Sequence, residues 1–171
     1  MIQLRCTKKV QDLLSLKKEN LSEPSDSQHI IGNWFVNVFT QNRRNILVYM
    51  NEKTLLSFII VGVTKSKAKL IIEGFPIGLA HLLDSEGFSD HQISKVVESL
   101  QEIYIAPTAS RKFNGNMNDL IFMYQNHIEM DGGLEHCDLE AIIKKVNRTP
   151  QRNIDWEYSI TKAKKLLISA T

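Results

Sequence analysis

The sequence predicts an α+β fold, an antiparallel sheet of about four to five strands with helices packed against it. Residues 34–63 contain three apolar runs rich in valine, isoleucine and aromatic residues, separated by two short polar breaks. Such residues suit the half-buried surface of a strand. Much of the remaining chain repeats its apolar residues with the spacing of amphipathic helices. We therefore expect a central meander at 34–63 that supports the helices.

The three runs of the meander differ in pattern. Residues 34–39 alternate with a period of two, which indicates a strand. Residues 46–50 are all apolar, so this strand is expected to be covered on both faces, or on one face with an aromatic side chain against the other. The third run, 55–61, follows a polar break at 51–54 whose length is typical of a hairpin loop. A helix over 46–61 is the alternative, and the β-branched residues and the polar break argue against it.

Outside the meander, two short strands and several helices are expected. Residues 1–6 alternate like a strand, and 103–105 form an apolar run placed at a sheet edge by the proline that closely follows it. Ser89 and Gln92 form a capping box that marks a helix start. Pro76 lies inside a helical pattern and predicts either two helices or one kinked helix. Helical spacing is found at residues 8–16, 66–83, 90–100, 117–130, 139–146 and from 159 or 161 to 168.

Length and composition favour one domain, residues 1–171, because a chain of 171 residues that is 43% apolar can build its own core. The first residues lack the apolar run of a signal sequence, and no stretch approaches the length of a membrane span. We therefore expect a cytoplasmic protein. Cys6 and Cys137 are expected to be reduced and buried thiols, with Cys6 packed in the core. Trp34 and Trp156 are interpreted as core anchors, because base stacking requires an exposed ring.

Charge is unevenly distributed, and it supplies the candidate binding residues. The formal net charge is +2, yet residues 141–171 carry seven lysine and arginine residues against two acidic ones. A basic tail can contact phosphate, or it can be a solvated helix face. Paired arginines in the first hairpin loop can likewise hold phosphate or an acidic partner, or simply be solvated. The candidate binding residues are Arg43, Arg44, Asn118, Arg148 and Arg152.

Arg111, Asp119 and His127 are the candidate catalytic residues. On a helix, Asp119 and His127 lie about 12 Å apart along the axis, too far for a direct hydrogen bond. As an enzyme site, His127 would be the acid or base, Asp119 its electrostatic partner through substrate or water, and Arg111 the stabiliser of transition-state charge. The alternative is a capping acid and an ordinary histidine. The sequence has no recognised zinc-ligand spacing and no phosphate-binding glycine motif, so we expect no metal and no cofactor.

Several motifs resemble a family of small bacterial and phage-associated proteins that is known only as a domain of unknown function. The resemblance runs in order along nearly the whole chain and implies one domain and a bacterial or phage source, but no activity. The motifs are M-I-Q-L-R-C-T-K-K at 1–9, G-N-W-F-V-N at 32–37, N-R-R-x-I-L-V-Y-M-N-E-K-T-L-L-S-F at 42–58, G-N-M-N-D-L at 115–120, G-G-L at 132–134 and N-R-T-P at 147–150.

Two functional hypotheses follow from the sequence. The first is a non-enzymatic binding or regulatory module for a protein partner or nucleic acid, since no known catalytic constellation appears while basic contact residues do. The second is an enzyme on phosphate-bearing substrates, such as a metal-independent ribonuclease-like toxin component. By analogy with other small orphan proteins, an association with defence or toxin–antitoxin systems is expected. The oligomeric state stays open, with a homodimer through a sheet edge among the options.

Overall fold

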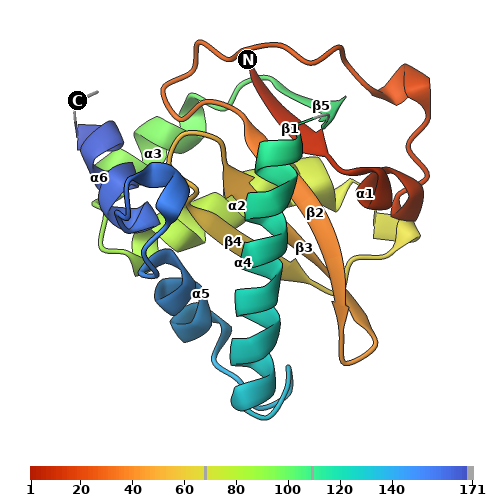
Figure 1. Ribbon diagram of the computed structural model, residues 1–171. Coiled ribbons are helices and arrows are strands. Elements are labelled where there is room, and N and C mark those ends of the chain that lie inside the picture. The colour runs from red at the N-terminus through yellow and green to blue at the C-terminus, as the bar shows by residue number, and fades with distance from the viewer. Residues whose placement is uncertain (68, 109, 169–171) are drawn as a thin grey trace.

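The computed structural model describes residues 1–67, 69–108 and 110–168 and confirms the α+β class and the predicted order of elements (Figure 1). The elements are β1 (Ile2–Cys6), α1 (Lys8–Leu13), β2 (Trp34–Gln41), β3 (Arg44–Asn51), β4 (Ser57–Val61), α2 (Leu70–Ser85), α3 (Asp90–Glu98), β5 (Ile103–Pro107), α4 (Arg111–Met130), α5 (Leu139–Asn147) and α6 (Ser159–Ile168). Short 3-10 turns lie at Lys18–Asn20, Lys65–Lys67 and Arg152–Ile154. No helix within the described residues is long and apolar enough to cross a lipid bilayer.

The five strands form one sheet in the order β4-β3-β2-β1-β5. The predicted antiparallel meander β2-β3-β4 is confirmed, and β5 lies at an edge as expected. The prediction of a purely antiparallel sheet is wrong, because β1 runs parallel to both β2 and β5. Helices interrupt the chain before β2 and before β5, and such crossover connections let a strand join its neighbour in the same direction.

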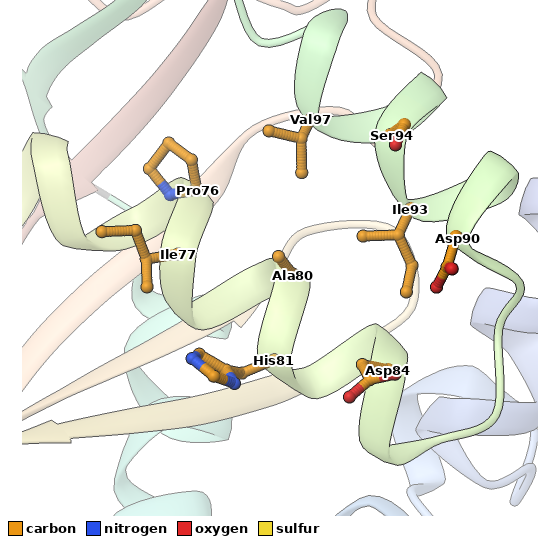
Figure 2. A pocket seen from close by; sticks show the side chains of 9 residues that line it. All are labelled: Pro76, Ile77, Ala80, His81, Asp84, Asp90, Ile93, Ser94 and Val97. Atoms are coloured by element: carbon orange, nitrogen blue, oxygen red, sulfur yellow. The ribbon is translucent and has the colours of Figure 1, made fainter.

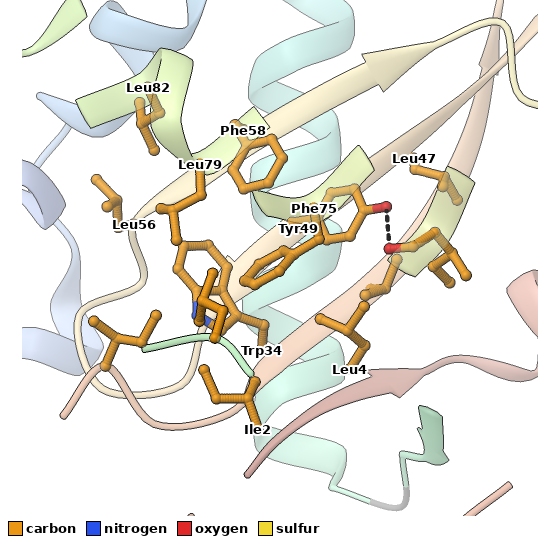
Figure 3. Packing of buried hydrophobic residues seen from close by; sticks show 14 of the residues in the cluster. Ile2, Leu4, Trp34, Leu47, Tyr49, Leu56, Phe58, Phe75, Leu79 and Leu82 are labelled. Carbon is orange, nitrogen blue, oxygen red and sulfur yellow. Dashed lines mark hydrogen bonds between the residues drawn. The ribbon is translucent and has the colours of Figure 1, made fainter. Parts of the chain in front are cut away.

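Each face of the sheet carries its own hydrophobic core. On one face, α1, α2, α3 and α6 pack around Trp34, whose ring centroid lies 5.1 Å from that of Phe75 and 5.8 Å from that of Phe58 (Figure 3). On the same face the Tyr49 hydroxyl donates a hydrogen bond of 3.1 Å to the Ile71 carbonyl (Figure 3). Helices α4 and α5 cover the other face. Strand β3 supplies side chains to both cores, which confirms its predicted double coverage.

Helix α2 matches one of its two predicted alternatives, whereas helix α4 starts earlier than expected. Helix α2 runs unbroken through Pro76, so of the two alternatives the single helix is correct. Helix α4 begins at Arg111, six residues before the expected start, with the Ser110 side chain accepting a hydrogen bond from the Phe113 N–H. The Phe113 ring stacks on Phe35 at a centroid distance of 4.2 Å. This packing outweighs the weak helix propensity of the glycine and asparagine residues around it.

The first hairpin is tighter than the sequence suggested. Strands β2 and β3 extend to Gln41 and Arg44, leaving a two-residue turn of Asn42 and Arg43 with φ angles of 47° and 62°. Two consecutive positive φ values define the type I′ turn, which matches the twist of the strands. The polar residues at 40–45 had suggested a longer loop, but their exposed positions near the strand ends tolerate polar side chains.

Replacing Arg43 by glycine is expected to raise the free energy of unfolding by about 1 kcal/mol. A side chain at positive φ crowds its own backbone, and glycine removes that cost. Arg44→Gly is the matched control. It places glycine in a strand, so it should instead lower stability by about 0.5–1 kcal/mol. Urea denaturation of both variants measures the two changes in the free energy of unfolding. If both variants were stabilised, or both destabilised, the assigned turn would be contradicted.

Candidate functional site

The long edge of β2 lacks a neighbouring strand over its second half. Strand β1 has five residues and stops at Cys6, which lies opposite Val36. Strand β2 has eight residues and continues to Gln41. Within the described residues, positions 37–41 therefore have no strand on the β1 side (Figure 1). The molecule presents a short open edge inside its sheet.

Two independent observations show which backbone groups face the open edge. The Thr7 N–H donates to the Val36 carbonyl at 3.0 Å, so the backbone N–H and C=O of Val36 face the β1 side. The backbone groups of every second residue after it, Val38 and Thr40, face the same side. In addition, the residues that flank a two-residue turn form a hydrogen-bonded pair, here Gln41 with Arg44. In an antiparallel ladder, hydrogen-bonded and non-hydrogen-bonded pairs alternate. The backbone groups of Phe39 and Asn37 therefore face β3, and those of Thr40 and Val38 face away from it.

Only part of this edge is occupied by hydrogen bonds. The Asn37 side chain folds over its start, where Oδ1 accepts from the Val38 N–H at 2.8 Å and from the Thr7 hydroxyl at 2.9 Å. Among the described residues, the Val38 carbonyl and the N–H and C=O of Thr40 have no partner on this side. Unpaired strand groups are a template for pairing with another chain.

A hollow of about 550 Å³ runs beside these groups, between α1 and α4. Its character is mixed, since it combines apolar side chains, three carboxamides and one lysine, with no carboxylate among the residues that line it. Phe122 is 65% exposed there, so its ring is available to a bound segment. The lining residues are Lys9, Leu13, Val38, Phe39, Thr40, Asn45, Asn118, Ile121, Phe122 and Gln125.

Three of the five predicted binding residues lie at this edge. Asn118 lines the hollow from α4. Arg43 and Arg44 are exposed at the hairpin tip, directly beyond the Thr40–Asn45 pair. Arg148 and Arg152 lie elsewhere, the first directly after the end of α5 and the second at the start of the following 3-10 turn. The strand, the turn and the helix were each expected, but their meeting at one edge was not.

Arg148 is engaged in a structural contact. Its guanidinium donates hydrogen bonds of 2.8 and 2.5 Å to the two carboxylate oxygens of Glu86, whose side chain is entirely buried. These hydrogen bonds raise the pKa of the Arg148 guanidinium. Arg152, by contrast, is exposed and makes no ion pair with the described residues.

The candidate catalytic residues are spread along α4. Arg111 is its first residue, and His127 follows sixteen residues later, about 24 Å along the axis. Asp119 is exposed midway between them, and His127 is half-buried. One small substrate group cannot contact all three side chains. The enzymatic alternative would therefore have to use them separately.

A second hollow, of about 590 Å³, lies between α2 and α3 (Figure 2). Its walls are mainly apolar, with Ile77 and Ala80 on α2 facing Ile93 and Val97 on α3. Asp84 and Asp90 lie at one end. This hollow is bounded by two helices and has no strand edge beside it, so it offers a ligand side-chain contacts and no strand pairing.

The two tryptophans have opposite environments, and one prediction is wrong. Trp34 is 1% exposed and confirmed as a core anchor, whereas Trp156 is 66% exposed. Composition alone could not distinguish them. Cys6 is buried as predicted, and its burial raises the pKa of the thiol, whereas Cys137 is only partly buried, so its predicted burial is wrong. The residues missed at the open edge, such as Thr40 and Phe122, carry no motif. The predicted strands 1–6 and 34–39 were of equal length, so the open edge follows only from the extension of β2 to Gln41 and from its pairing with β1.

The comparison with known families confirms the resemblance. Residues 3–162 match the model of the family described as Domain of unknown function (DUF6933), and the chain belongs to that family. No match to the chain is found among curated proteins.

Proposed function

We propose that this member of the DUF6933 family is a non-enzymatic binding module that takes up an extended segment of a protein partner at the open edge of β2. The observation that carries the proposal is the set of unpaired groups on Val38 and Thr40 beside a hollow. An extended peptide adds to an exposed edge through main-chain hydrogen bonds, and pockets for alternate side chains give it specificity. A cytoplasmic location is part of the proposal, since both cysteines are free thiols.

The surroundings of the edge favour one added strand over a second sheet. Proteins usually protect a free edge with charges, bulges or covering elements. Here α1 and α4 flank the edge with Lys9 and Leu13 on one wall and Asn118 and Phe122 on the other. Such walls obstruct a second sheet while leaving a channel beside the strand. The Asn37 side chain closes one end of the channel, so the added strand would begin opposite Val38.

The charge of the edge selects the chemistry of the segment. Lys9, Arg43 and Arg44 are exposed around it and make no ion pair with the described residues. No carboxylate lines the hollow. We therefore expect a segment in which acidic residues alternate with apolar ones, because alternate side chains of a strand point to opposite faces. The acidic residues would then face the α1 wall with Lys9, and the apolar residues would face the α4 wall and pack on Phe122.

Selection from a phage-displayed library of random peptides tests this proposal. The wild-type chain should enrich peptides that alternate acidic and apolar residues. Thr40→Pro should weaken the binding of a selected peptide about tenfold, because proline removes the N–H that would pair with it. Thr40→Ala keeps that N–H and is the matched control. Because the Thr40 N–H faces away from β3, proline at this edge position should leave the protein folded.

Amide hydrogen exchange provides the second measurement. In the free protein the Thr40 amide should exchange quickly and the neighbouring Phe39 amide slowly. Of the two N–H groups, only that of Phe39 faces β3 and is hydrogen-bonded within the sheet. A bound peptide should slow exchange at Thr40. Unchanged affinity in Thr40→Pro, or protection that appears only at other amides, would overturn strand addition. Charge reversal in Arg43→Glu should weaken binding most at low salt.

A further inference from the structure

The segment from Pro150 to Tyr158 displays two aromatic rings on a closely held loop between α5 and α6, away from the open edge of β2 (Figure 1). Trp156 is 66% exposed and Tyr158 is 45% exposed. Tryptophan and tyrosine are enriched at interfaces, because their rings are apolar at one end and polar at the other. This loop is distinct from the surface assigned above to peptide binding.

Several contacts fix the shape of the loop. Pro150 and Tyr158 form an antiparallel bridge, and the Trp156 N–H donates to the Gln151 carbonyl at 3.0 Å. Ile154 is buried in the core under α4, and the Asn153 side chain donates a hydrogen bond to that of Asn116 on α4. The loop is therefore anchored to the body of the protein on the side opposite its exposed rings.

The backbone at Trp156 is unusual. Asp155 and Trp156 have φ angles of 60° and 63°. Aspartate tolerates this left-handed region, but a bulky residue there is an outlier that costs free energy. Such outliers cluster where function requires them. Glycine would relieve the strain, yet the sequence places its most exposed tryptophan at this position.

Basic residues outnumber acidic ones in and after the loop, since residues 150–165 contain four lysine and arginine residues against Asp155 and Glu157. Arg152 within the loop is exposed and makes no ion pair with the described residues, and Lys162 lies on the first turn of α6. Lys165 bonds Glu157 at 2.8 Å, which lowers the pKa of that carboxyl and offsets its charge. Lys112 lies about 6 Å along α4 from Asn116, the residue that holds the loop. The loop and the start of α6 thus combine two exposed rings with a net charge of +2 over residues 150–165.

We propose that Trp156 is a stacking platform for a base of single-stranded nucleic acid, with Arg152 and Lys162 contacting the adjacent phosphates. Exposed aromatic rings within a basic surface are the features by which proteins hold single strands irrespective of sequence. The net charge of +2 over residues 150–165 favours a polyanion over a neutral or basic protein partner.

Fluorescence anisotropy with labelled single strands of polythymidylate and polyuridylate tests this proposal, and the two probes distinguish DNA from RNA. Trp156→Gly should weaken binding of the better probe about tenfold while leaving the fold intact, since glycine accepts the positive φ. Trp156→Asn is a second variant for the same conformation and should behave alike. Trp156→Phe keeps a stacking ring and should stay within a few-fold of wild type.

Salt dependence and fluorescence complete the test. Affinity should fall as the salt concentration rises. Arg152→Ala should reduce the slope of log affinity against log salt concentration by about one, the contribution of one phosphate contact. Binding should quench the emission of exposed Trp156, whereas buried Trp34 should stay unquenched in Trp156→Phe. Thr40→Pro should bind the strands like wild type, which separates this surface from the peptide edge. Absent binding at low salt, equal affinity in Trp156→Gly, or equal affinity for a duplex would overturn the proposal.

Discussion

Replacing Asn147 by leucine is expected to lower the free energy of unfolding by about 3 kcal/mol. The Asn147 carboxamide accepts a hydrogen bond from the Ser57 N–H at 2.9 Å and donates one to the Ser57 carbonyl at 2.7 Å. A side chain thus replaces a neighbouring strand at the first residue of β4. Both residues are buried, so leucine would leave two backbone groups without hydrogen bonds and out of reach of water.

The contact between Asn147 and Ser57 belongs to a larger buried hydrogen-bond network. The Ser57 hydroxyl also bonds the Tyr124 hydroxyl at 2.9 Å, which joins β4, α4 and α5 at one buried point. Urea denaturation measures the loss. Asn118→Leu makes the same chemical change at an exposed position of α4 and should alter stability by less than about 0.5 kcal/mol. Equal stability of the two variants would show that the Asn147 carboxamide is dispensable.

Replacing Arg148 by methionine is expected to cost about 3 kcal/mol. The variant would leave the fully buried Glu86 carboxylate without the two hydrogen bonds that hold it. An uncompensated buried charge is more costly than the loss of the pair itself, because the carboxylate has given up its water. The Arg148 side chain is 44% exposed, so most of the lost stability comes from the buried Glu86 carboxylate.

A double variant tests this explanation. Glu86→Leu combined with Arg148→Met removes both charges and should recover most of the stability, since an apolar pair of similar size often replaces a buried ion pair at little cost. Lys145→Met, at an exposed neighbouring position on α5, should change stability by less than about 0.5 kcal/mol. If the double variant were as unstable as Arg148→Met, the loss would come from packing and not from the charge.

Most of the fold followed from local patterns. Alternation, β-branched runs and polar breaks located the meander, and the Ser89–Gln92 capping box located the start of α3, where the structure has both reciprocal bonds. The direction of β1 did not follow, because it depends on how the crossovers route the chain and not on any residue of the strand. The first turns of α4 were also missed, since the stacking of Phe113 on Phe35 joins residues far apart in sequence.

The candidate sites show the same limit more strongly. Arg43, Arg44 and Asn118 could be proposed one by one as polar residues on turns and helices, but only the packing of α4 beside β2 brings Asn118 to the edge. Arg148 has the same composition signal as Arg152, and its engagement with Glu86 depends on a contact across 62 residues. The exposure of Trp156 likewise depends on the path of its loop.

The position of β1 between β2 and β5 also sets the order in which the sheet can assemble. The meander joins neighbours in the chain, whereas β1 pairs Ile2 with Ile103, and closing so long a loop costs entropy before any contact repays it. During synthesis the first strand leaves the ribosome early and then waits for its last partner until about a hundred further residues have been added. The hairpins are therefore expected to form the folding nucleus, and the amino-terminal strand to be locked in place late.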